Sequence, residues 1–316
     1  MIVKIFNTIG SRSFVFTFVL VFFTVFFSFF CINNGTWFWN QSLEILGNIS
    51  LIILSIALIT GLEIQIKGRK LDGIHMIVFP TIFLFFPFVY DLKVIPVFLG
   101  LIMILGYSIF INTLHSKTPR KWIFDLSLII SIMTQFKVVF AILYILPVMV
   151  ILKKGLKDRR SLLALLLPVS LIPFTVQSVL MTFPSEMNYF NDHTSDMGLL
   201  QLRDLTNEEI VWIIMVALSL IICFFQIREA SRKFSYPKLF SGFAYMTFWL
   251  LFSVLYGFLG LHFGEGRWFF SFIPVAYFFG AFLESLKTDL QKNTLFILLF
   301  FGAIIFKLLE YKIISL

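Results

Sequence analysis

The sequence predicts an all-α protein, a polytopic bundle of membrane-spanning helices. Of its 316 residues, 59% are hydrophobic and only 13% are charged, and the mean hydropathy is +0.96. Soluble domains average about 25% charged residues, so this composition excludes a soluble globular domain and a disordered chain. Several apolar runs approach the roughly 20 residues that a helix needs to cross a bilayer. Alternating strand-length segments, the signature of a membrane barrel, are absent from the sequence.

Hydropathy divides a single transmembrane domain, residues 1–316, into about eleven apolar spans. The first, Phe14–Ile32, follows a short polar lead and lacks a small-residue cleavage site, which predicts a signal-anchor. No internal repeat is visible in the sequence. The further spans are Glu44–Leu62, Ile74–Tyr90, Val94–Leu114, Ile123–Gln135, Val138–Leu152, Ser161–Met181, Ile210–Ile227, Leu239–Phe263, Trp268–Leu286 and Thr294–Leu309.

The distribution of basic residues predicts a cytoplasmic N-terminus and an external C-terminus. Most of the 25 Lys and Arg residues fall in alternate connections, such as Lys153–Arg160 and Arg228–Lys238. An excess of Lys and Arg is typical of the cytoplasmic loops of membrane proteins. The formal net charge of +8 therefore indicates topology and not a nucleic-acid partner. The outer side keeps only Lys93, Lys137, Arg203, Arg267, Lys307 and Lys312.

The fifth and sixth spans are unusually short. As a helix, Ile123–Gln135 is about 20 Å long, whereas the hydrocarbon core is about 30 Å thick. Lys137 would then lie at membrane depth, where charge is tolerated inside protein or beside water. Three arrangements fit: a half-membrane hairpin, two helices flanking a polar cavity, or one long kinked helix with Lys137 reaching the interface.

One connection is long. Thr182–Glu209 is predicted to be an extracytoplasmic loop, and a loop of this length is usually functional or disordered. Met197–Leu205 has the composition of a small amphipathic surface helix. Thr206 and Glu209 have the spacing of a capping box at the start of the next span.

The sequence offers no support for metal, redox or nucleotide chemistry. Cys31 and Cys223 lack CxxC spacing, and we interpret both as buried apolar residues. His193 has acidic neighbours, but its loop contains no second histidine, so the sequence does not predict a metal site there. The motifs of P-loop, Rossmann and serine-hydrolase proteins are missing from the sequence.

The strongest candidate for chemistry is the tight outer turn His262-Phe-Gly-Glu265-Gly-Arg267-Trp268. Glu265 has the chemistry of a general base, Arg267 of a phosphate ligand and His262 of a proton donor. The alternative is an interfacial turn with a Glu–Arg pair and a membrane-belt tryptophan.

Three further acidic residues can each be interpreted either as functional or as ordinary structural residues. Glu44 and Asp91 are either site residues or ordinary interface residues. Asp125, inside the fifth span, is either functional or an acid favoured by the dipole at a helix N-terminus.

Two segments resemble the GT-C-type membrane glycosyltransferases. The first runs from Asp125 through Lys137 and Pro147 to the basic segment Lys153–Arg160, and it resembles the short-helix pair of that family. The second, Glu265-Gly-Arg267-Trp-Phe-Phe-Ser-Phe-Ile-Pro274, resembles its late Arg-aromatic segment. In length, in the spacing of its apolar segments and in composition, the chain also resembles a family of Phe-rich inner-membrane proteins of Bacteroidota. This resemblance implies a multi-pass protein of a bacterial inner membrane but no activity.

The GT-C resemblance implies sugar transfer at the outer face from a polyprenyl-phosphate donor, with Lys137 and Arg267 at the phosphate. The family carries a catalytic acid in its first outer loop. Here that loop, Asn33–Leu43, contains no acid, and Glu44 directly after it is the only substitute. A scaffold of this type without transferase activity is therefore an open alternative.

Three functions follow from these observations. The first is a membrane enzyme with Glu44 or Glu265 as base and Lys137, Arg267 and His262 on the substrate. The second is a non-catalytic subunit of an envelope assembly or secretion complex, which meets a membrane or periplasmic partner through Thr182–Glu209. The third is a transporter or flippase, for which charges near the middle of the bilayer are needed.

Overall fold

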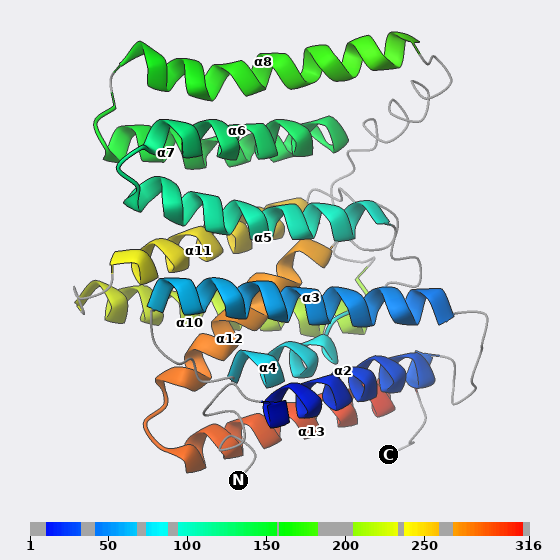
Figure 1. The fold of residues 1–316 in the computed structure, drawn as a ribbon. Coiled ribbons are helices and arrows are strands. Elements are labelled where there is room, and N and C mark those ends of the chain that lie inside the picture. Colours follow the sequence, from blue (N-terminus) through cyan, green and yellow to red (C-terminus); the bar gives the residue numbers. More distant parts are fainter. Residues whose placement is uncertain are drawn as a thin grey trace. The chain divides into compact units, whose positions relative to one another are not determined.

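The computed structural model describes residues 11–32, 42–67, 74–87, 94–156, 158–182, 205–232, 237–258 and 268–311. Within these ranges the chain is helical and contains no strand, which confirms the all-α prediction (Figure 1). The α-helices are α2 (Ser11–Ile32), α3 (Ser42–Lys67), α4 (Ile74–Phe83), α5 (Val94–His115), α6 (Pro119–Phe136), α7 (Ile145–Lys153), α8 (Arg159–Thr182), α10 (Asn207–Arg232), α11 (Pro237–Phe258), α12 (Phe272–Ser285) and α13 (Asp289–Glu310). Two 3-10 helices are η2 (Val138–Tyr144) and η4 (Phe269–Ser271).

Among the described residues, 5 helices are long and apolar enough to cross a membrane. These stretches are Ser13–Cys31, Arg159–Val179, Asn207–Gln226, Ser241–Phe258 and Asp289–Glu310. The total of about eleven spans and the orientation of the termini stay predictions.

The chain divides into two compact units, each built from segments far apart in the sequence. Unit 1 comprises Met1–Val97, Gln201–Val254 and Gly264–Leu316, and unit 2 comprises Phe98–Leu200 and Leu255–Phe263.

The core of unit 1 is formed by α4 and α12, which pack against each other. All residues of α4 are buried, as are almost all of α12. Phe79 and Phe83 of α4 meet Phe272 edge to face, with ring centroids 5.9 and 5.8 Å apart. The outer layer includes α2, which packs on α4, and α10, which packs on α12. This burial shows why the two shortest apolar helices of unit 1 are stable without spanning length.

The predicted span Ile74–Tyr90 is helical only as far as Phe83 within the described residues. A turn follows, in which the amides of Leu84, Phe85 and Phe86 bond to carbonyls three residues back. A 10-residue helix is about 15 Å long, half the thickness of the hydrocarbon core. Hydropathy alone does not separate a core helix of this kind from part of a span.

In unit 2 the short fifth span is longer than predicted. The helix α6 begins at Pro119, because proline is favoured in the first turn, and it ends at Phe136. Asp125 is partly exposed and lies beyond the first turn of α6, which contains no acid. The interpretation of Asp125 as a helix N-terminal acid is therefore wrong.

At Lys137 the backbone is extended, with φ −151° and ψ 126°, and the 3-10 helix η2 follows. Ser131 and Tyr144 share a side-chain hydrogen bond. On one continuous helix these residues would lie about 20 Å apart. The chain therefore turns back at Lys137, which favours the predicted hairpin over a single kinked helix.

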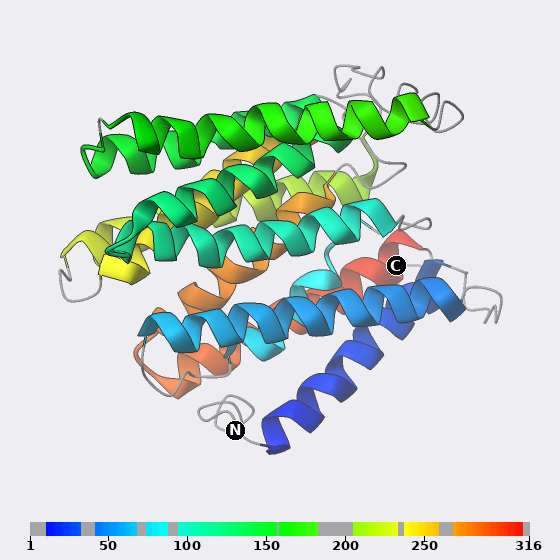
Figure 2. The ribbon, with the colours of Figure 1, turned by 45° about the horizontal axis from the view of Figure 1, so that its top comes forward.

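The helix α8 packs along α6, and α6, α7 and α8 run side by side in both ribbon views (Figures 1 and 2). The α7–α8 connection contains Gly155 at φ 61°, a backbone conformation that favours glycine. The amide of Leu156 donates to the carbonyl of Ile151, which completes a Schellman-type helix end.

Polar contacts join the two basic connections of unit 2. Arg120 pairs with Asp158 at 3.0 Å, and Lys154 Nζ donates to the Ser116 carbonyl at 2.8 Å. The pKa of Asp158 is lowered, chiefly by the hydrogen bond from Ser161; burial opposes this effect, and the Arg120 cation lowers the pKa further. Burial lowers the pKa of Lys154. Both groups lie in the connections, outside the apolar helices.

Candidate functional site

The residues predicted to form the site are only partly described. Glu44 lies in the first turn of α3, whose backbone is described there, but its side chain is not. His262, Glu265 and Arg267 lie outside the described residues, as does the loop from residue 183 to residue 204. Their convergence with Lys137 on one substrate stays a prediction.

Lys137 occupies the break between α6 and η2 and is 5% exposed. Its amide donates to the Met133 carbonyl, and its own carbonyl accepts from the Phe140 amide. Both bonds hold the residue at the tip of the hairpin. A buried cation at a backbone break agrees with the sequence expectation that Lys137 is enclosed by protein or water.

One face of α6, N-terminal to Lys137, carries the polar residues Ser127, Ser131, Thr134 and Gln135, and Ser131 lies three or four positions from each of the others. Ser131 Oγ bonds to the Ser127 carbonyl at 2.8 Å and also meets the Tyr144 hydroxyl. The Ser131 carbonyl accepts from Thr134 at 2.7 Å and from Gln135 at 3.2 Å. The bond between Ser131 and Tyr144 ties α6 to η2, and the other bonds lie within α6; all of them use neutral side chains.

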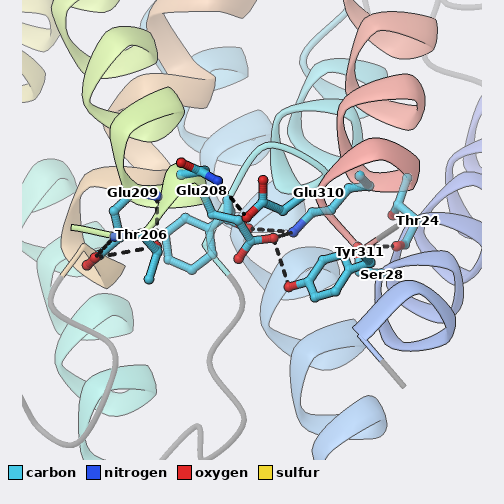
Figure 3. A network of polar contacts seen from close by, with 10 residues as sticks. Thr24, Ser28, Thr206, Glu208, Glu209, Glu310 and Tyr311 are labelled. Carbon is cyan, nitrogen blue, oxygen red and sulfur yellow. Dashed lines mark hydrogen bonds and ion pairs between the residues drawn. The ribbon is translucent and has the colours of Figure 1, made fainter. Parts of the chain in front are cut away.

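Unit 1 contains a buried ion pair that sequence analysis did not identify. Lys307 of α13 is fully buried and pairs with Glu208, which is labelled in Figure 3, at the start of α10. The Tyr311 hydroxyl donates to the same carboxylate oxygen at 2.9 Å. Lys307 also donates to the carbonyl of Phe86, after α4, at 3.4 Å. A buried charge needs such partners, because desolvation otherwise costs several kcal/mol.

Next to this pair, Glu209 forms the predicted capping box. Its amide donates to Thr206 Oγ1 at 3.2 Å, and its carboxylate accepts from the Thr206 amide at 3.1 Å (Figure 3). The reciprocal bonds confirm that prediction. The other carboxylate oxygen of Glu209 accepts a hydrogen bond from the Trp268 indole at 3.1 Å. The cap therefore has a second role, because it fixes the tryptophan that directly follows Arg267 in the sequence.

Trp212 extends the contacts into the core. Its indole donates to Ser271 Oγ at 2.7 Å, and Ser271 donates to the Trp268 carbonyl at 2.6 Å. The ring of Phe86 meets Trp212 edge to face at 4.9 Å. We call Glu208, Glu209, Trp212, Trp268, Ser271, Lys307 and Tyr311 the Glu208 network. It joins the ends of α4, α10 and α13 to the start of η4.

One sequence signal could have identified this network. Lys307 lies inside the apolar segment Ala303–Leu309, and an ionisable residue within a span requires a partner. Sequence analysis placed Lys307 on the outer side without a role. It gave no partner because pairing between distant helices is not encoded in local spacing.

Among the residues that the structure describes, no group of three His, Cys, Asp or Glu side chains is arranged to hold a metal ion. No protein-family model, curated protein or solved structure matches this chain.

Proposed function

We propose that the chain is a multi-pass protein of a bacterial inner membrane that acts at the outer face on a polyprenyl-phosphate-linked sugar, in the manner of a GT-C-type glycosyltransferase. In this proposal the N-terminus is cytoplasmic and the C-terminus external. Glu265 or Glu44 acts as general base, Arg267 and Lys137 bind the phosphate, and His262 donates a proton.

The observation that carries the proposal is the anchoring of Trp268. Its indole bonds to Glu209 and its carbonyl accepts from Ser271, so the residue adjoining Arg267 is fixed by two buried bonds. A phosphate site works best when its ligands are held by a rigid base. In the proposed topology, the Glu208 network and the tip of the α6–η2 hairpin both belong to the outer side.

The test is sugar transfer by the full chain in lipid nanodiscs, with radiolabelled polyprenyl-phosphate sugars and a mixture of acceptor lipids. We expect product with the wild-type chain. Glu265→Gln should abolish it if Glu265 is the base, and Glu44→Gln is the parallel variant. Arg267→Gln and Lys137→Gln should weaken binding of a fluorescent polyprenyl phosphate about tenfold or more, as for loss of a charge-assisted bond. Lys93→Gln, an outer cation outside the proposed site, is the matched control and should bind normally.

A non-catalytic envelope subunit is the second candidate, and a specific observation favours it. Both described acids at the start of α10 already have structural partners: Glu208 bonds Lys307 and Tyr311, and Glu209 bonds Thr206 and Trp268. Under this alternative the chain binds no polyprenyl phosphate, and in native membranes photo-cross-linkers within Thr182–Glu209 capture one defined partner protein.

A transporter has the least support. Glu208 is the second residue of α10, and Lys307 lies in the last turn of α13. The pair therefore lies at helix ends, whereas a coupling site is expected near the bilayer midplane.

A further inference from the structure

The α5–α6 and α7–α8 connections of unit 2 are strongly positive. Residues 116–122 and 153–161 together contain eight cations and one acid, Asp158. Lys157 lies outside the described residues, and the other seven cations are described. We call the eight cations the basic platform: Lys117, Arg120, Lys121, Lys153, Lys154, Lys157, Arg159 and Arg160.

The structure fastens the two connections to each other. Lys154 Nζ donates to the Ser116 carbonyl at 2.8 Å, and Arg120 pairs with Asp158 at 3.0 Å. Each contact joins one connection to the other, although the two are far apart in the sequence. Both connections lie at the same end of α6, α7 and α8, at the left of Figure 1. The cations of the two connections therefore belong to one surface.

The positive charge of this surface is largely uncompensated. Its one acid already pairs with Arg120 and accepts a hydrogen bond from Ser161 at 2.6 Å. Within the described ranges, four exposed cations have no ion-pair partner: Lys117, Lys153, Arg159 and Arg160. Like charges held close together repel one another, so the surface favours an anionic partner.

The basic platform lies at the boundary of the apolar helices. The stretch of α8 that is long enough to cross a membrane begins at Arg159. In the first turns of α6, Lys121 Nζ lies over the Trp122 ring, 5.6 Å from its centroid. Tryptophan is enriched at the level of the lipid headgroups. These positions place the cations at the depth of the lipid phosphates.

Membrane orientation alone does not account for this arrangement. The α12–α13 connection of unit 1 is predicted to lie on the same side, yet the segment from Glu284 to Lys292 contains two cations and two acids. An excess of cations in separate loops is sufficient to orient a chain. Direct bonds that gather two basic connections into one surface are a further property, which orientation does not require.

We propose that the basic platform binds the headgroups of anionic phospholipids, with its Arg and Lys side chains on their phosphates. Arg and Lys form charge-assisted hydrogen bonds to phosphate, and clusters of four to eight such residues beside a membrane helix are typical of anionic-lipid binding. In the proposed topology this leaflet is the cytoplasmic one. The platform lies at the end of α6 opposite to Lys137, so the inference does not rest on sugar transfer.

The test is native mass spectrometry of the full chain in neutral detergent micelles, titrated with phosphatidylglycerol or with zwitterionic phosphatidylcholine. We expect phosphatidylglycerol to bind about tenfold more tightly or better. Arg159→Gln/Arg160→Gln should weaken its binding about 5- to 30-fold, as for the loss of two cations at a lipid surface. The control Arg228→Gln/Lys287→Gln removes two exposed cations from unit 1 and should change the binding less than about twofold.

A variant of opposite sign separates lipid binding from a structural role. Asp158→Asn removes the one acid of the surface and releases Arg120, so phosphatidylglycerol should bind several-fold more tightly. Equal thermal midpoints of wild type and Arg159→Gln/Arg160→Gln without added lipid show that the fold is intact. Equal binding of the two lipids, equal losses in both double variants, weaker binding by Asp158→Asn, or displacement of the lipid by millimolar inorganic phosphate would each overturn the proposal.

Discussion

The two units use different chemistry to join their helices at the ends predicted to lie outside. Unit 1 relies on full charges, because Lys307 is fully buried against Glu208 and both have further hydrogen-bond partners. The hairpin of unit 2 uses neutral groups, chiefly the bond between Ser131 and Tyr144, and has Lys137 at its tip.

The two kinds of contact differ in how much stability is lost when one partner is removed. Removing one member of a buried ion pair leaves an uncompensated charge, whereas removing one neutral hydroxyl leaves only an unmade hydrogen bond. The Glu208 network is therefore suited to a fixed base. The neutral contacts of the hairpin cost less to break, so they suit a segment that changes conformation when a ligand binds.

The largest effect is expected from breaking the ion pair. Lys307→Met should lower the free energy of unfolding by about 3–5 kcal/mol, because it leaves Glu208 buried without its counter-charge. Denaturant titration in mixed micelles measures this loss. The double variant Glu208→Gln/Lys307→Met removes both charges and should recover most of it. If the double variant is as unstable as the single one, the charge argument is wrong and packing of the lysine chain dominates.

The second effect concerns the contact between α12 and α4. A Cβ atom at Gly280 would lie 2.2 Å from His75 Nδ1, so Gly280→Ala forces the buried imidazole to move. We expect a loss of about 1–3 kcal/mol, the usual cost of overpacking.

Gly302 of α13 is the matched control, because a Cβ there meets nothing within 4 Å. Gly302→Ala should be neutral or stabilising by up to about 1 kcal/mol, since alanine is the better helix former. Equal effects at both glycines would contradict the packing account.

A substitution in the hairpin should lower the free energy of unfolding by less. Tyr144→Phe removes the hydroxyl that meets Ser131 and should cost about 0.5–1.5 kcal/mol. A double-mutant cycle with Ser131→Ala isolates the pair. Additive losses in that cycle would mean that the bond contributes nothing to the stability of unit 2.

The smallest effect is expected at the exposed contact between Arg120 and Asp158. The pKa of Asp158 lies below its ordinary value of 3.8 in the folded chain, chiefly because Ser161 donates to it. A lowered folded pKa adds stability that is complete above pH 3.8 and is lost as the pH falls through the folded pKa. Unfolding midpoints of wild type and Asp158→Asn should therefore differ slightly at pH 6 and converge in strong acid. A difference that grows in acid has the wrong sign for this account.

Local signals in the sequence predicted much of the fold. The apolar runs located the helices, Lys137 between two short apolar runs located the break, and Thr206 with Glu209 located a helix start. Each is a property of neighbouring residues, so spacing is sufficient. Hydropathy did not reveal that α4 and α12 are short core helices, because a protein interior and lipid chains are equally apolar.

The Glu208 network could be predicted only in part. Lys307 is visible as a charge in an apolar run, but its pairing with Glu208 and the carbonyl of Phe86 depends on three segments meeting in space. The second role of Glu209, on the Trp268 indole, likewise has no local signature.

The most direct test of the proposed site is a cryo-EM map of the full chain in nanodiscs with a bound polyprenyl phosphate. The account predicts phosphate density between Lys137 Nζ and the Arg267 guanidinium, each about 2.7–2.9 Å from a phosphate oxygen, with Glu265 or Glu44 on the same wall. Density for the phosphate elsewhere, with Lys137 and Arg267 directed into separate lipid-facing surfaces, would contradict the account and leave the non-catalytic subunit as the better description.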